Sequence, residues 1–209
     1  MKKLFFACIL GLLSTHFTAN AQGAIEISPF VGYTFSGTAN AYNGFSYVDY
    51  DIKDAMSYGV TLGAGVGDLV QGEFSYTRVD TRMVRTGGLA QPESFDIGVE
   101  YYQLGAVKEF EVQPTLLPFV KASLGANRYF DKAGKYGSDW LFSGVIGVGA
   151  KKYFSDRIGF KIYSNFVMPM QFNGLGFWVG TGGASGGASF YVPLVHWDLG
   201  GALIFKLDR

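Results

Sequence analysis

Apolar and polar residues alternate along most of this chain, and such alternation predicts β-strands. In the first segment of this kind, Ile25, Ile27 and Val31 lie on one face, whereas Glu26 and Ser28 lie on the other. No segment shows apolar residues at helical spacing over a useful length. The pattern predicts eight strands, at residues 25–35, 56–66, 70–77, 94–108, 115–128, 140–153, 157–167 and 190–207.

The connections between these strands alternate in length. Short turns are expected at 67–68, 109–114 and 155–156, and long loops at 36–55, 80–93, 129–139 and 168–189. Short turns at one end and long loops at the other are typical of outer-membrane barrels, in which the turns face the periplasm. A soluble β-sandwich is not expected to sort its connections in this way. We therefore predict an all-β fold: an eight-stranded, antiparallel, up-and-down transmembrane β-barrel.

The composition supports an exterior that faces lipid. Charged residues make up 16% of the 209 residues, against about 25% in an ordinary globular domain. A soluble barrel of the lipocalin type would turn its polar faces to water and would need more lysine and glutamate. The aromatic content of 17% excludes disorder, and the lack of a basic excess argues against a nucleic-acid partner. Candidates for an aromatic girdle are Tyr33, Tyr58, Tyr76, Phe166, Trp197 and Phe205.

The N-terminal segment predicts export. Two lysines precede an apolar run at 4–13, and a small-residue cleavage site follows at 19–21, which is the order expected of a secretory signal peptide. We expect residues 1–21 to be this signal peptide and residues 22–209 to form one barrel domain. Cleavage would leave 17 − 2 = 15 basic and 17 acidic residues and would remove Cys8, the only cysteine. Disulfide and zinc–thiolate chemistry are then excluded, and no cofactor or metal is expected.

Several segments resemble strands of small bacterial outer-membrane proteins of the OmpA/OmpX type. The likeness extends over essentially the whole exported part of the chain. Its motifs are strand patterns, so the resemblance implies the barrel fold and says little about activity. The segments that carry it are IEISPFVGY at 25–33, EYYQLGA at 100–106, PFVKASLG at 118–125 and GVGAKKYFSDRIGF at 147–160.

Three carboxylates and three ammonium groups are predicted to point into the barrel. A buried charge without a partner is costly, so these groups should pair with one another. An eight-stranded barrel is just wide enough to be filled by its own side chains, which favours a salt-bridged plug. A gate whose rearrangement admits ions is the alternative. The six residues are Glu26, Glu73, Glu100, Lys121, Lys151 and Lys161.

The fourth predicted strand contains a conflict of phase. Val99 and Tyr101 predict one lipid-facing phase, whereas Leu104 belongs to the other. Keeping a single phase would turn Gln103 toward lipid. We therefore expect a β-bulge, or an exit from the membrane, near Tyr101 and Tyr102.

His196 is the only histidine outside the signal peptide, and Asp198 lies two residues on, hence on the same strand face. With a serine, these are the residue types of a hydrolase triad, and some barrels of the resembled family are lipid A deacylases or acyltransferases. Their His-Ser pairing is not reproduced at Ser164, which also falls in a lipid-facing phase. A structural histidine near the rim is favoured.

The last long loop is the most distinctive segment. No charged residue occurs between Ile162 and Trp197, and residues 174–187 contain seven glycines. One interpretation is a flexible glycine-rich loop folded over the barrel mouth. The other is a contact surface, because exposed apolar residues often mark interactions. The candidate contact residues are Phe172, Leu175, Phe177 and Trp178.

Three arginines, Arg78, Arg82 and Arg85, cluster at the second long loop. Guanidinium groups pair well with phosphates, so contact with lipopolysaccharide is one interpretation. Ordinary solvated loop charge explains the cluster equally well.

These observations lead to one expectation for function and two alternatives. We expect a non-enzymatic outer-membrane protein with a structural or surface-interaction role, exported through the periplasm and monomeric. Its expected partners are outer-membrane lipid, lipopolysaccharide, the outer-membrane assembly machinery and, through the long loops, extracellular surfaces. The first alternative is a narrow channel or binding barrel for small hydrophobic solutes. The second is a lipid A-modifying hydrolase that uses His196.

Overall fold

The computed structural model describes most of the chain. The predicted signal peptide at 1–21 lies outside the described residues. Within the described part, no helix is long and apolar enough to cross a bilayer. Side chains are described except at 39–42, 47–48 and 171–191. The described ranges are 25–42, 47–87, 91–113, 115–135, 137–180, 183–191 and 194–207.

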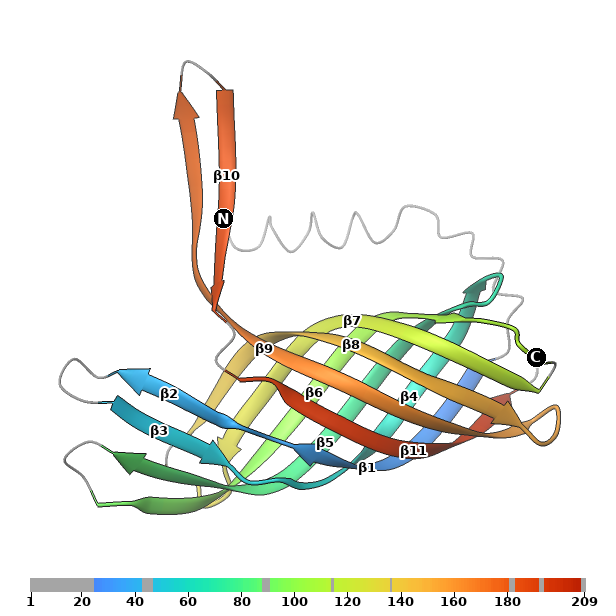
Figure 1. The fold of residues 1–209 in the computed structure, drawn as a ribbon, viewed down its shortest axis with the longest axis horizontal. Helices are drawn as coiled ribbons and strands as arrows, with labels where there is room; N and C mark the ends of the chain where they lie inside the picture. Colours follow the sequence, from blue (N-terminus) through green and yellow to red (C-terminus); the bar gives the residue numbers. More distant parts are fainter. Residues whose placement is uncertain are drawn as a thin grey trace.

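Eight strands form a closed antiparallel barrel (Figure 1). Each barrel strand pairs with the next along the chain, and the last strand pairs with the first, which closes the sheet. The fold class predicted from the alternation is therefore confirmed. The barrel strands are β1 (Ile25–Phe35), β4 (Ala55–Gly67), β5 (Val70–Gly87), β6 (Glu93–Glu109), β7 (Leu116–Asp131), β8 (Ser138–Tyr153), β9 (Ile158–Gly180) and β11 (His196–Leu207).

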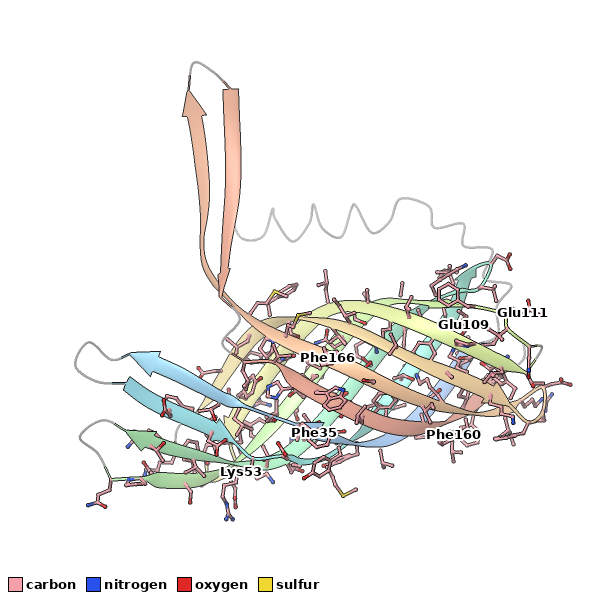
Figure 2. The ribbon with its side chains drawn as sticks, viewed as in Figure 1. Phe35, Lys53, Glu109, Glu111, Phe160 and Phe166 are labelled. Carbon is pink, nitrogen blue, oxygen red and sulfur yellow. The ribbon has the colours of Figure 1, made fainter. Side chains whose placement is uncertain are left out.

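The two ends of the barrel differ in their connections. Strands β4–β5, β6–β7 and β8–β9 are joined by short turns at one end, which we call the lower end. At the upper end, the first connection folds into a hairpin of β2 (Thr38–Tyr42) and β3 (Tyr47–Ile52), and β3 also pairs with β5. Figure 1 shows this hairpin continuing beyond the barrel wall. In Figure 2 the upper end lies on the left, where Lys53 is labelled, and the lower end lies on the right, where Glu109 is labelled.

The last long connection differs from its prediction. Strand β9 continues to Gly180 and pairs with β10 (Gly183–Tyr191), and β11 begins only at His196. The predicted strand at 190–207 is therefore too long at its start. The predicted loop at 168–189 is a paired hairpin, which Figure 1 shows projecting away from the barrel. Pairing between the two strands satisfies the backbone hydrogen-bonding groups of this glycine-rich segment. Glycine content alone does not reveal that the segment forms paired strands.

Strand β6 passes through Tyr101 and Tyr102 without a bulge. Its register with β5 and with β7 is continuous from end to end. Val99, Tyr101 and Gln103 are buried on the inner face, and Leu104 is exposed on the outer face. The expected bulge is wrong because the upper part of the interior is itself apolar. An apolar side chain on this strand therefore does not have to face outward.

The outer face of the barrel is largely apolar. Its large side chains are exposed even though they alternate with buried polar residues on the same strands. The girdle candidates Tyr33, Tyr58, Phe166, Trp197 and Phe205 are also exposed on this face. Further members are Val31, Leu62, Phe74, Leu104, Leu124, Ile146, Ile162 and Leu203.

Two inner-face glycines make room for aromatic rings. A Cβ atom at Gly59 would lie 2.7 Å from a ring carbon of Phe30, and one at Gly149 would lie 2.4 Å from a ring carbon of Phe119. Both distances are too short for a carbon–carbon contact. Phe30 and Phe119 can therefore fill the narrow interior only because their cross-strand neighbours on the adjacent strands carry no side chain.

Candidate functional site: the barrel lumen

The lower lumen is filled by buried ion pairs. Lys151 is 1% exposed, and its Nζ lies 2.7 Å from Glu26 Oε2 and 2.6 Å from Glu109 Oε1. The same ammonium donates a hydrogen bond of 2.8 Å to Gln71 Oε1. The Tyr153 hydroxyl group donates a hydrogen bond to the other carboxylate oxygen of Glu26, Oε1. Strands from opposite sides of the barrel are thus joined through a single lysine.

A second ion-paired group is centred on Glu73. Lys121 Nζ lies 2.6 Å from Glu73 Oε1, and Lys161 Nζ lies 3.0 Å from Glu73 Oε2. Lys161 also donates a hydrogen bond of 3.2 Å to Thr61 Oγ1. Across the two groups, three ammonium groups face three carboxylates. The charges of the lower lumen therefore balance.

The structure brings together all but one of the predicted lumen residues. Glu100 instead lies on the outer face of β6, where its Oε1 accepts a hydrogen bond of 2.8 Å from Arg78 Nη1. Its placement in the lumen is wrong because the register of β6 turns Val99 and Tyr101 inward. Glu109, which the sequence places in a predicted turn, is the third lumen carboxylate. A residue at a turn carries no alternation signal, so sequence reasoning missed it.

A small cavity lies above these ion pairs. Its volume is about 40 Å³. Because one water molecule needs roughly 10–15 Å³ of such space, the cavity has room for about three. Lys121 and Lys161 line it from the lower side, and Val145 and Val167 line it from the upper side. The cavity therefore marks the change from a charged to an apolar interior.

Asp198 lines the same cavity and is held by hydroxyl groups. Ser57 Oγ and Thr34 Oγ1 donate hydrogen bonds of 2.6 Å and 3.0 Å to Asp198 Oδ1. Among the described residues, no ammonium or guanidinium group forms an ion pair with this carboxylate. Asp198 thus differs from the carboxylates below it, each of which contacts a lysine.

The upper lumen is apolar around one buried histidine. His196 is 1% exposed, and its Nδ1 and Nε2 atoms lie 3.0 Å from Ser36 Oγ and 3.1 Å from Tyr129 Oη. The Tyr129 ring also stacks on the imidazole at a centroid distance of 6.4 Å. The surrounding buried cluster consists of Ile52, Val79, Ile97, Val99, Tyr101, Val145 and Val167.

His196 does not form the arrangement of a hydrolase triad. A triad needs a serine and a carboxylate on the two ring nitrogens, whereas here Tyr129 occupies the position opposite Ser36. Ser164 lies on the outer face and accepts a hydrogen bond of 2.9 Å from Trp197 Nε1. The residue types are present, but their geometry is that of a buried polar contact.

Strand β9 contains the four predicted surface-contact residues, Phe172, Leu175, Phe177 and Trp178. Their side chains lie outside what the structure describes. The contact surface therefore stays a prediction.

Comparison with known proteins reveals likeness in structure only. No protein-family model matches the chain, and no curated protein sequence matches it. Neisserial surface protein A superposes with a TM-score of 0.58 at 12% identity, over 88% of this chain and 97% of that one. OprG from Pseudomonas aeruginosa superposes with a TM-score of 0.53 at 10% identity, over 88% of this chain and 98% of OprG. AlkL superposes with a TM-score of 0.52 at 14% identity, over 93% of this chain and 96% of AlkL. The chain has the fold of these small outer-membrane barrels: closed, antiparallel and eight-stranded.

Proposed function

We propose that this chain is an outer-membrane β-barrel protein with a structural or surface-interaction role, and that it is not an enzyme. The contrast between the two faces of the sheet carries the proposal. The inner face holds ion pairs and buried polar groups, whereas large apolar side chains such as Leu104 and Ile146 lie exposed outside. An exterior with so many exposed apolar side chains is costly in water and is matched by a bilayer.

Fractionation tests the location. The full chain, expressed in a Gram-negative host, should lose its leader and appear in the outer-membrane fraction. It should also migrate faster on a gel before boiling than after, because a closed barrel resists detergent. A protein recovered soluble from the periplasm would overturn the proposal.

We further propose that the lumen is sealed. Its lower part is filled by paired charges and its upper part by apolar side chains, and the cavity of about 40 Å³ between them is far below the roughly 300 Å³ of a small-ligand site. Purified barrels in planar bilayers should therefore pass little current. A steady single-channel current would instead support the narrow-channel alternative.

A lipid-hydrolysis assay tests the non-enzymatic assignment. Both nitrogens of His196 already contact hydroxyl groups, and the ring is buried, so we expect no release of acyl chains from lipid A by the natural chain or by His196→Ala. Hydrolysis that disappears in His196→Ala would establish the enzyme alternative.

We expect the barrel to be monomeric, to be inserted by the outer-membrane assembly machinery and to contact lipopolysaccharide in the outer leaflet.

A further inference from the structure

A group of charged side chains lies on the outer wall of β5–β7, in the upper part of the barrel. Arg78, Glu100 and Arg128 are cross-strand neighbours in one row across these three strands. Asp80 lies two residues beyond Arg78 on the same outer face, and Lys132 follows β7. We call these five residues the outer charge cluster.

Arg78 lies near each of the other two cations of this cluster. Arg78 Nη2 and Lys132 Nζ lie 2.7 Å and 3.0 Å from the same atom, Asp80 Oδ1, so they are at most 2.7 + 3.0 = 5.7 Å apart. The guanidinium groups of Arg78 and Arg128 both lie over the ring of Phe130, at 4.6 Å and 4.9 Å from its centroid. A single anionic group at this place can therefore be approached by more than one cation.

The cluster carries one more positive than negative charge. Three cations face two carboxylates, and Arg128 is the least satisfied of them. Its Nη1 lies 3.5 Å from Glu100 Oε2, a longer contact than the 2.8 Å between Arg78 and the same carboxyl group. Its Nε is buried and finds no hydrogen-bond partner among the residues that the structure describes, so only the exposed end of the guanidinium group can meet a ligand. The side chains of Arg128 and Lys132 are each 39% exposed, so both can be reached from outside the barrel.

Aromatic residues surround the cluster on the outer face. Tyr58 donates a hydrogen bond to Asp80, and Tyr76 and Tyr102 donate hydrogen bonds to Glu100. The Trp140 ring lies 6.0 Å from the Arg128 guanidinium. Tyrosine and tryptophan with an apolar body and a polar tip are typical of the membrane–water interface. The cluster therefore lies at the depth of lipid headgroups if the apolar wall below it spans the bilayer.

We propose that the outer charge cluster binds a phosphate group on the headgroup of an outer-leaflet lipid, with Arg128 and Lys132 as the main contacts. This proposal rests on the outer-membrane location proposed above. Guanidinium groups match phosphate oxygens with paired hydrogen bonds, and the excess charge of the cluster is complementary to an anion. Arg82 and Arg85 are not part of the site, because each pairs with a carboxylate outside the cluster: Arg82 with Asp96 and Arg85 with Glu93.

Native mass spectrometry of the refolded full-length barrel in neutral detergent tests this site. The probes are a bisphosphorylated lipid A, the same lipid after removal of both phosphates, and inorganic phosphate. Three variants are compared with the natural chain: Arg128→Gln, Arg128→Gln with Lys132→Gln, and the control Arg82→Gln. Arg82 is a matched control because it is also an outward arginine on this wall, with a 61% exposed side chain and one carboxylate partner.

Arg128→Gln should weaken binding of bisphosphorylated lipid A about tenfold, because it removes charge-assisted hydrogen bonds. The double variant should lose more, and Arg82→Gln should lose less than about twofold. Dephosphorylated lipid and inorganic phosphate should bind weakly to every variant. Equal binding of the two lipids, equal losses for Arg82→Gln and Arg128→Gln, or binding of inorganic phosphate as tight as that of the lipid would overturn the proposal. Heat-modifiable mobility and membrane fractionation of the same variants report separately on the barrel and its location.

Discussion

The lower and upper parts of the lumen fill the same narrow barrel with opposite chemistry. Below the cavity, Lys121, Lys151 and Lys161 are each buried against a carboxylate. Above it, Ile97 and Val99 pack in an apolar cluster, and the two ring nitrogens of His196 contact the hydroxyl groups of Ser36 and Tyr129. The lower part should therefore depend on charge complementarity, whereas the upper part should depend on volume. The following predictions test this contrast, from the largest expected effect to the smallest.

Lys151→Met should be the most damaging single change. It leaves Glu26 and Glu109 buried without their nearest cation, and breaking a buried pair in this way costs about 3–5 kcal/mol. The free energy of unfolding, measured by urea titration of the barrel in lipid vesicles, should fall by this amount. The control is Lys206→Met, because Lys206 is more exposed and 4.0 Å from Glu26; its loss should be below about 1 kcal/mol.

Removing the two carboxylates that lost their cation should rescue this variant. Adding Glu26→Gln and Glu109→Gln to Lys151→Met removes the unpaired charges, so most of the lost free energy of unfolding should return. A Lys151→Met loss as small as that of Lys206→Met would show that charge pairing does not stabilise the lower lumen.

Ile97→Ala should have the next largest effect. It removes buried side-chain volume from the upper cluster, and such truncations cost about 2–5 kcal/mol because a cavity remains. The same urea titration should show a loss of about 3 kcal/mol. Ile146→Ala is the matched control on the outer face, where lipid can occupy the vacated space, and its loss should be about 1 kcal/mol. Equal losses for the two variants would mean that the upper lumen is not tightly packed.

Ser57→Ala tests the boundary between the two parts. It removes a hydrogen bond of 2.6 Å to the buried carboxylate of Asp198, which should lower the free energy of unfolding by about 1–2 kcal/mol. Ser164→Ala is the control, because its outward hydroxyl accepts a hydrogen bond from an exposed tryptophan. Its cost should be below about 0.5 kcal/mol, as for an ordinary surface change. If both variants unfold alike, the hydroxyl groups around Asp198 do not compensate for its missing cation.

Much of the fold could be predicted from the sequence because a membrane barrel imposes a strict local rule. Every second residue must suit lipid, and the connections must alternate between two compartments. The alternation identified the eight strands and the inward direction of Glu26, Glu73, Lys121, Lys151 and Lys161 (all buried in the structure).

The same rule failed where the inner face of a strand is apolar and its outer face carries charges. Val99 and Tyr101 follow the lipid-facing pattern but fill the upper lumen, which reversed the assignment of Glu100. The glycine-rich connection at 168–189 carries no alternating charge, so its pairing as a hairpin of β9 and β10 could not be foreseen. Glu109 was missed because it lies where the strand runs into a turn.

The sequence by itself determined the strands, their faces and the low charge of the exterior, since these follow from the period-two alternation of each strand. Only the tertiary structure decided which charges meet. Lys151 contacts Glu26 from 125 residues away, and Lys161 contacts Glu73 from 88 residues away. Such contacts depend on the closure and stagger of the whole barrel, which set the height of each side chain in the lumen. Local alternation contains no information about that height.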